Sequence, residues 1–314
     1  MVEFRHQFIM PFFRPNPRHL RSALASLMIT SVLLPAMAGA DVLYDGYSKI
    51  LLDGQHVGFV ILKYDFDVKK KEFSAEYFVK TDKRGGNVTE SLRAKATETL
   101  KPISFQYTEL AGDSTKTIDA TFKGETMTAK VVENGKTQTL QKKAPKGTFL
   151  AIFLAYVMLQ GKDGIKKGVK YNYQAIAEED GGSYSGEAYI AGEEAILGIN
   201  AFKVLNTFKG EQFVSYYTYK GEVIATRSPV KKMASELVAN PTEATEGQVL
   251  NTKSLEQVFG TVPRGQDNPL SKRSLMPEAA PALSANKASD KSTDRSSDKV
   301  PAKPSTPTST PGGP

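Results

Sequence analysis

The most constraining feature of the sequence is an uninterrupted apolar segment that lies between Gly147 and Gly161. Every residue in the range Phe149–Leu159 is apolar, whereas a helix on a protein surface carries polar residues every three to four positions. Thr148 is suited to cap the N-terminus of a helix here, and Gly161 is suited to end it in the left-handed conformation. We therefore predict a buried core helix over residues 148–160, too short to cross the roughly 30 Å hydrocarbon core of a bilayer.

The rest of the folded part alternates apolar and polar residues with the period of a β-strand. The clearest alternation spans Val57–Val68, directly after Asp53-Gly54, which is a strong hairpin signal. Asn134-Gly135 marks another hairpin, and Lys209-Gly210 and Lys220-Gly221 separate later strands into a meander. With about thirteen strands and one helix, we expect a mostly β fold, an antiparallel β-barrel or half-barrel of meanders around one central apolar α-helix.

Residues 1–40 have the composition of a secretory signal peptide. Basic residues including Arg14 and Arg18 precede an apolar run over Ala23–Leu34, and Ala38-Gly39-Ala40 forms a cleavage site of the A-x-A type. We expect cleavage before Asp41, with a β-barrel-like domain over residues 41–240. The remaining expected parts are a linker with a short helix over residues 241–261 and a disordered tail rich in Pro, Ser, Thr and Lys over residues 262–314.

That tail contains a four-residue repeat over residues 288–299. The repeat places Asp at every fourth position between Ser and Thr, which disfavours a helix. We expect a solvated spacer, and the alternative is a weak segment that binds the cell wall or a partner.

The available residue types limit the chemistry of the mature chain. The sequence has no cysteine, and His56 is the only histidine outside the signal segment. A Cys–His pair and a zinc site with two imidazoles are therefore excluded, and His56 itself is expected to be a solvated turn residue. The carboxylates of Glu178–Asp180 and Glu193-Glu194 lack the alternate spacing of a Ca²⁺ loop, so we expect acidic hairpin loops. We predict no catalytic, cofactor-binding or metal-binding residues, and no enzyme activity.

The charge distribution argues against a nucleic-acid partner. The net charge of +7 falls to +4 when the four arginines and one glutamate of the signal segment are removed, and most of the remainder lies in the tail. We expect the lysine runs to keep strand edges and loops soluble. The alternative is that some of them line the mouth of a cavity and meet anionic lipid head groups or wall polymers. These runs are residues 69–71, 142–143, 166–167 and 231–232.

Several segments carry a resemblance to a known group of proteins. They are L-L-D-G-Q-H-V-G-F-V at residues 51–60, the apolar helix followed by G-V-K-Y-N-Y, and Y-T-Y-K-G-E-V-I-A-T-R-S at residues 217–228. Over residues 42–240 the chain resembles an uncharacterised family of exported bacterial β-barrel-like domains. It is similar to the segment that precedes transglutaminase-like domains in some bacterial exported proteins, and more distantly to half-barrel lipoprotein carriers. Because the chain has no cysteine nucleophile, transglutaminase activity is not expected.

These observations predict a periplasmic or secreted, non-enzymatic protein of the cell envelope, without a transmembrane span after signal cleavage. Its first candidate function is to bind a lipid or another amphipathic ligand inside the β-barrel-like domain. The alternative is a structural or accessory protein that interacts with envelope proteins or with peptidoglycan. The all-round apolar helix favours a plug in a closed core over a movable lid above a lipid. The candidate ligand-lining residues are Phe149, Phe153, Tyr156, Tyr217 and Tyr219.

Overall fold

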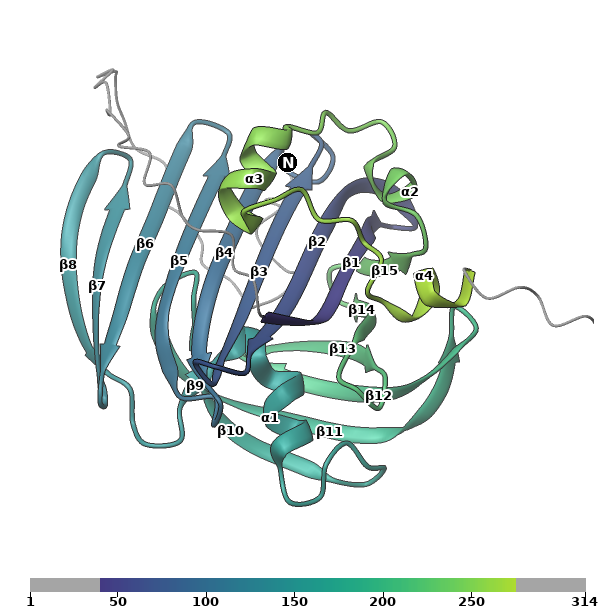
Figure 1. The fold of residues 1–314 in the computed structure, drawn as a ribbon. Coiled ribbons are helices and arrows are strands. Elements are labelled where there is room, and N and C mark those ends of the chain that lie inside the picture. Colours follow the sequence, from purple (N-terminus) through teal and green to yellow (C-terminus); the bar gives the residue numbers. More distant parts are fainter. Residues whose placement is uncertain (1–39, 275–314) are drawn as a thin grey trace, which may run out of the picture. The chain divides into compact units, whose positions relative to one another are not determined.

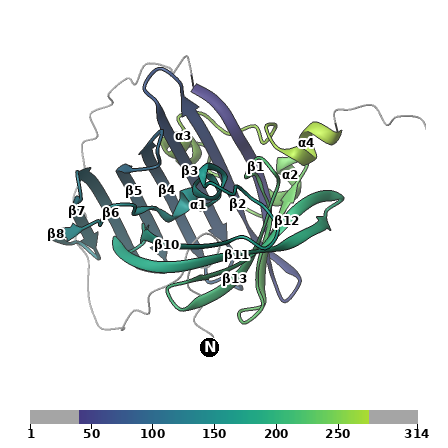
Figure 2. The same ribbon diagram turned by 90° about the horizontal axis from the view of Figure 1, so that it is seen from below.

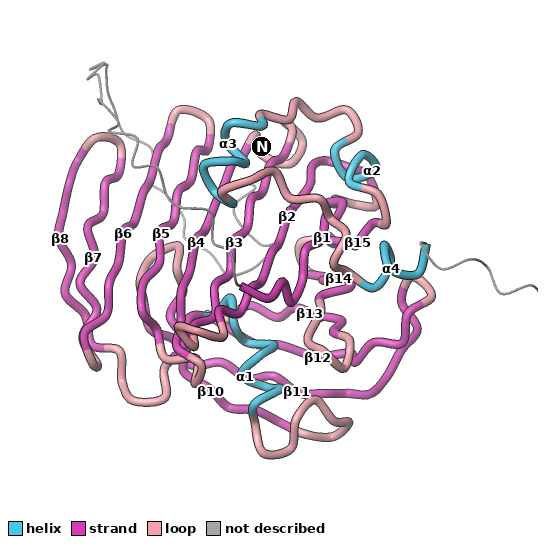
Figure 3. Tube along the Cα trace, in the orientation of Figure 1, coloured by secondary structure: helices cyan, strands magenta, loops and turns pink. Residues whose placement is uncertain are grey.

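The computed structural model describes residues 40–274, which fold into one large curved sheet with short helices on its two faces (Figures 1 and 3). The expected signal peptide lies outside the described residues apart from Ala40. The same holds for the expected tail from residue 275 onward, including the repeat over residues 288–299.

The sheet contains fifteen strands, and the expected mostly β, antiparallel fold is confirmed. All neighbouring strands pair antiparallel except β9, which runs parallel to β10. The strands are β1 (Ala40–Leu52), β2 (Gln55–Asp67), β3 (Glu72–Thr81), β4 (Val88–Thr97), β5 (Pro102–Ala111), β6 (Ser114–Lys123), β7 (Thr126–Glu133), β8 (Lys136–Lys143), β9 (Phe149–Leu150), β10 (Lys170–Ala177), β11 (Gly182–Ile196), β12 (Ile199–Phe208), β13 (Glu211–Tyr217), β14 (Val223–Ser228) and β15 (Met233–Val238).

Two meanders share one seam in this sheet. The spatial order runs from β8 back to β1, continues with β15, and then runs back from β14 to β9. The seam is the antiparallel pair of β1 and β15, in which Tyr47 lies opposite Val238 and Leu52 lies opposite Met233. Because β8 and β9 are the two ends of this order, the sheet is open, so the closed form of the expected barrel or half-barrel is not present.

The expected tight turns join consecutive strands of the meanders. Asp53 and Gly54 have φ angles of 48° and 78°, and Asn134 and Gly135 have φ angles of 49° and 78°. Positive φ at both central residues is what a two-residue hairpin of type I′ requires, because its twist matches that of the flanking strands. Lys209 occupies the same left-handed region with a φ of 51°.

The predicted helix over residues 148–160 is shorter than expected. Its first apolar residues form β9, the next three form a 3₁₀ turn (Ala151–Phe153), and only Leu154–Gln160 forms the α-helix α1. Thr148 does not cap this helix, because its Oγ1 is buried without a hydrogen-bond partner. Gly161 is extended, with φ −61° and ψ 151°, and not left-handed. An all-apolar run indicates burial but contains no period that would locate the helix boundary.

Helix α1 lies on the inner face of the curved sheet and α3 on the outer face (Figure 2). Helix α3 spans Thr252–Phe259, the range in which we expected a short helix, and Asn251 caps it by accepting the N–H of Ser254 at 3.3 Å. Its Leu255 is fully buried in a cluster with Phe59 and other side chains of the outer face. The other helices are α2 (Pro241–Thr245) and α4 (Pro269–Ser274).

The ordered chain extends further than the sequence predicted. Residues 263–274, which we call the C-terminal strap, lie along β1, although we expected disorder from residue 262. Asp45 Oδ2 accepts the backbone N–H groups of Arg264 at 3.0 Å and Gly265 at 2.8 Å, and Asn268 donates to the Asp45 carbonyl at 3.0 Å. This segment is ordered by its polar contacts to Asp45, which is far away in the sequence. Its own composition therefore does not predict that it is ordered.

Candidate functional site

The segment that carries α1 packs its aromatic side chains against β2 and β3. The Phe153 ring lies 6.2 Å from that of Tyr64 and 6.3 Å from that of Phe73, and the Tyr156 ring lies 5.0 Å from that of Tyr64. The Tyr64 hydroxyl donates to the Ile152 carbonyl at 2.8 Å. One tyrosine therefore holds the start of the segment by both a ring contact and a hydrogen bond.

The opposite side of the same segment packs against β10 to β13. Leu154, Met158 and Phe149 belong to a second buried cluster with residues of those strands. The Phe149 ring lies 5.5 Å from that of Tyr173. The segment thus joins the two arms of the sheet, because its two sides belong to different hydrophobic clusters.

The structure buries four of the five predicted ligand-lining residues. Phe153 and Tyr156 lie together in the first cluster, while Phe149 and Tyr217 lie in the second. None of these four exposes more than 7% of its surface. Tyr219 is separate and 71% exposed, with the Lys220 ammonium 5.5 Å from its ring centre. The residues predicted to line a ligand site therefore form packed core, apart from one solvent-exposed tyrosine.

The turn between β10 and β11 places carboxylates in the interior. We expected Glu178–Asp180 to be an acidic hairpin loop; it is a hairpin turn, but Glu178 and Glu179 are buried. Lys209, from the turn between β12 and β13, donates to Glu179 Oε1 and to Asp180 Oδ2, both at 2.5 Å. Burying these charges is tolerable because the lysine and the carboxylates compensate one another.

Glu178 has a different set of contacts from its neighbour. Its Oε1 accepts the backbone N–H of Ile152 at 3.2 Å, at the start of the 3₁₀ turn, while its Oε2 has no hydrogen-bond partner. Burial first, and then the nearby Glu179, hold the pKa of Glu178 well above its usual value. Burial also raises the pKa of Glu179 to about 7, against the opposing effect of Lys209.

Two tyrosine–glutamate pairs on β3 to β5 face this turn. The Tyr77 hydroxyl donates to Glu90 Oε1, and the Tyr107 hydroxyl donates to Glu109 Oε2 at 3.1 Å. Burial is the first cause of the raised pKa of both tyrosines, and nearby carboxylates, including Glu179, contribute. We call Glu90, Glu109, Glu178 and Glu179 the inner acidic cluster.

In the inner acidic cluster, the raised pKa values of Glu178 and Glu179 favour their protonated forms, and Glu179 also pairs with the Lys209 ammonium. Lys142 of β8 reaches the cluster from the far arm of the sheet, donating to the Asp180 carbonyl at 3.1 Å. Within residues 40–274, no group of three or more His, Cys, Asp or Glu side chains has an arrangement that could hold a metal ion. The hydrogen bond from Lys142 to the Asp180 carbonyl therefore links β8 to the turn between β10 and β11.

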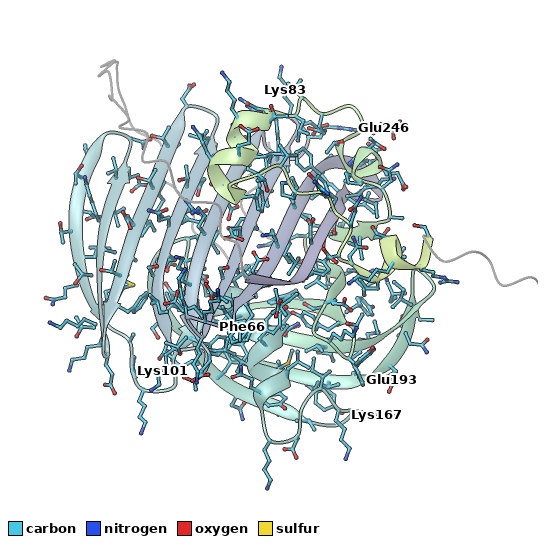
Figure 4. All side chains as sticks on the ribbon, in the orientation of Figure 1. Phe66, Lys83, Lys101, Lys167, Glu193 and Glu246 are labelled. Atoms are coloured by element: carbon cyan, nitrogen blue, oxygen red, sulfur yellow. The ribbon has the colours of Figure 1, made fainter. Side chains whose placement is uncertain are left out.

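The other polar residues singled out in the sequence lie in strands: His56 is half-buried in β2, and Glu193 and Glu194 belong to β11, so the expected solvated turn residue and the second expected hairpin loop are not formed. His56 Nε2 lies 2.9 Å from the Gly58 carbonyl, beside the first hairpin turn. Glu194 pairs with Lys203 at 3.2 Å, and Glu193 is exposed. Lys167 and Glu193 are labelled on the periphery in Figure 4. Among the described residues, these acidic and basic surface groups do not come together in one common site.

The comparisons with known proteins give a structural similarity and no family. No family model matches the chain, and no curated protein matches it. A similar solved structure is a β-barrel-like protein of domain of unknown function DUF1849 from Brucella abortus, with 10% sequence identity and a TM-score of 0.47, covering 62% of this chain and 95% of that chain. These comparisons give no support to the expected similarity to the segment preceding transglutaminase-like domains or to lipoprotein carriers.

No helix within residues 40–274 is long and apolar enough to cross a membrane.

Proposed function

We propose that the chain is an exported, non-enzymatic protein of the cell envelope whose domain has a structural or accessory role toward other envelope proteins or peptidoglycan. The observation that carries this proposal is the burial of Phe149, Phe153, Tyr156 and Tyr217 in packed clusters. Side chains that are buried against one another contribute to a packed core and do not line an open ligand space. Export rests on the signal-like residues 1–40.

In this proposal α1 is the plug of a half-barrel. Its segment contacts β2 and β3 on one side and β10 to β13 on the other. The Glu178 carboxylate and the Tyr64 hydroxyl both hold Ile152, at the start of the plug. A movable lid would have to break these buried hydrogen bonds each time it opened, which makes a permanent plug the better interpretation.

A lipid or amphipathic ligand is a second candidate, and the open sheet is the observation that favours it. Strands β8 and β9 are the two ends of the strand order and do not pair with each other. The two arms could therefore move apart without breaking a strand ladder. Such a ligand would meet apolar side chains of the inner face and the polar groups of the inner acidic cluster.

Native mass spectrometry of the protein exported with its own signal segment, after gentle extraction, distinguishes the two candidates. The structural proposal expects the mass of the mature chain alone, beginning at Asp41. A reproducible additional mass, identified as a lipid after denaturation, would replace it with the carrier function. A version lacking residues 1–40 should stay in the cytoplasm, and its appearance in the envelope fraction would contradict export by this segment.

A further inference from the structure

The edge strand β8 differs from the other end of the sheet. Strand β9 has only two residues, and both are buried. Strand β8 has eight, spanning Lys136–Lys143, and they are exposed apart from the half-buried Leu140 and Lys142. Within the described residues, β7 is the only strand that pairs with β8. One long edge of the sheet is therefore accessible, as the left side of Figure 1 shows.

The direction of the free backbone groups on β8 follows from two hydrogen bonds. Ala144 donates its N–H toward the β7 side, to the Glu125 carbonyl at 2.8 Å, and Asn134 donates to Thr115 of β6 at 2.9 Å. Along an antiparallel strand, the residues that bond to one neighbour alternate with those that face the other way. The even-numbered residues of β8 therefore bond to β7. The outward-facing N–H and C=O groups belong to Thr137, Thr139, Gln141 and, at the end of the strand, Lys143.

Between its terminal lysines, this edge lacks the features that usually prevent strand addition. The pairing of β7 with β8 is continuous from Glu133 opposite Lys136 to Thr126 opposite Lys143, without a bulge. The five residues Thr137–Gln141 contain no proline and no charge. Natural edge strands are usually interrupted by bulges, prolines or central charges, so a regular edge of this length fits a strand that accepts a partner.

The lysines at the two ends of β8 select what can pair with it. A second copy of β8 would place lysine opposite lysine: an antiparallel pair centred on Thr139 brings Lys136 against Lys142, and a parallel pair brings each lysine against its equivalent. Like charges directly opposite each other are unfavourable in a sheet. An extended segment with a carboxylate near each end has complementary charge in either direction.

We propose that β8 is a docking edge for an extended segment of a partner protein, with acidic residues near its two ends and uncharged residues between them. The partner would add a sixteenth strand through the backbone groups of Thr137, Thr139 and Gln141. This inference rests on the proposed accessory function, because it assigns the surface through which the domain would meet another envelope protein.

The test uses a synthetic heptapeptide of alternating threonine and valine with a glutamate at each end, added to the mature full chain. We expect the backbone amides of Thr137, Thr139 and Gln141 to exchange more slowly with deuterium when the peptide is bound. The same peptide with lysine at each end should bind at least about tenfold more weakly, because its charges meet Lys136 and Lys142. Lack of protection at these amides, or equal affinity for both peptides, would overturn the proposal.

Two matched variants separate the backbone contact from the side chain. Thr139→Pro removes the central outward N–H without removing a hydrogen bond to β7, and it should abolish binding. Thr139→Ala keeps the N–H and should bind as the parent does. Binding that survives in Thr139→Pro, while its circular dichroism matches that of the parent, would contradict the docking edge.

The free chain provides the remaining comparison. If the three amides are already protected without peptide, and protection rises with protein concentration, the occupant is a second copy. If protection disappears when residues 275–314 are removed, the occupant is the chain's own tail. Either result overturns the partner proposal, whereas unprotected amides in the free chain support it. None of these readouts depends on co-purified lipid, so failure here is distinct from failure of the proposed function.

Discussion

The Glu178 carboxylate accepts a hydrogen bond of 3.2 Å from the backbone N–H of Ile152, so the turn between β10 and β11 holds the start of the segment that carries α1. Burial and Glu179 raise the pKa of Glu178 well above its usual value. A neutral acid still accepts a hydrogen bond through its carbonyl oxygen. The contact therefore does not require a charge.

The hydrogen bond between Glu178 and Ile152 predicts different effects on stability for two substitutions of Glu178. Glu178→Gln keeps an acceptor of the same shape and should change the free energy of unfolding by less than about 1 kcal/mol at neutral pH. Glu178→Ala leaves the Ile152 N–H unpaired and opens a cavity, so we expect a loss of roughly 2 to 4 kcal/mol. Urea denaturation followed by circular dichroism measures both. Equal losses for the two variants would show that the acceptor is not what matters.

The plug interpretation is tested by alanine substitution along the apolar segment. Phe153→Ala should cost about 3 to 5 kcal/mol, because the side chain is fully buried and the site cannot collapse around the cavity. Phe149→Ala and Tyr156→Ala should also be strongly destabilising. Tyr219→Ala is the exposed control and should change the unfolding free energy by less than about 0.5 kcal/mol. The denaturation midpoints of the parent and these four variants provide the measurement.

A different pattern would favour the lipid candidate. A continuous face of positions in the segment whose alanine variants barely change the midpoint would indicate a lid over ligand space. Loss of a co-purified lipid in those same variants would strengthen that interpretation.

Most strands were predictable from the sequence, because apolar residues recur at every second position and hairpin signals separate the runs. The alternation from Val57 to Val68 corresponds to β2, and the Asp53-Gly54 signal corresponds to a turn with the expected left-handed φ angles. The apolar segment was less predictable. Its residues are apolar whether they form β9, the 3₁₀ turn or α1, so composition revealed burial but not conformation.

The inner acidic cluster could not be predicted in the same way. Glu178 and Glu179 follow a buried strand and adjoin two glycines, a pattern typical of an exposed hairpin loop. They are buried because Lys209, from a distant turn, and the backbone of Ile152 lie against them. Such pairings depend on how the hairpin turns of β10 to β13 and the segment after β9 lie side by side, which no local pattern contains.

The C-terminal strap provides a prediction about the domain boundary. Removing residues 275–314 should leave the melting temperature unchanged. Removing residues 263–314 should lower it, because Asp45 loses both strap N–H donors and the Tyr47 hydroxyl loses the Pro263 carbonyl. We expect a cost of roughly 2 to 4 kcal/mol from these buried contacts. Differential scanning calorimetry of the two truncations measures it, and equal melting temperatures would show that the strap does not stabilise the domain.

A single substitution tests the same strap without shortening the chain. Asn268 donates to the carbonyls of Asp45 and Gly265 and to Ser271 Oγ. Asn268→Ala should increase deuterium exchange and proteolytic cleavage within residues 263–274 while strands β2 to β7 stay protected. Arg264→Ala keeps the backbone donor to Asp45 and serves as the control. Similar cleavage in both variants would contradict a role for Asn268 in holding the strap.

The last prediction concerns pH and rests on Glu76, a carboxylate of β3 whose Oε2 is buried without a partner. Burial first, and then Asp65, raise its pKa from 4.5 to about 7, while Lys63 and Arg93 oppose this. The folded protein therefore holds this proton more tightly than the unfolded chain does. The group stabilises the fold at low pH, and its contribution is lost as the pH rises from about 4.5 to about 7.

Substituting Glu76 should flatten the dependence of stability on pH. Glu76→Gln should become more stable than the parent by roughly 1 to 3 kcal/mol at pH 8, and the difference should shrink toward pH 4.5. Asp67→Asn is the control of opposite sign, because backbone N–H donors, first that of Lys70, lower the pKa of Asp67. That variant should lose stability at neutral pH and match the parent once the pH is below the pKa of Asp67. Urea midpoints measured from pH 3 to pH 8 give both curves, and a Glu76→Gln curve parallel to that of the parent would show that Glu76 does not titrate differently in the folded and unfolded states.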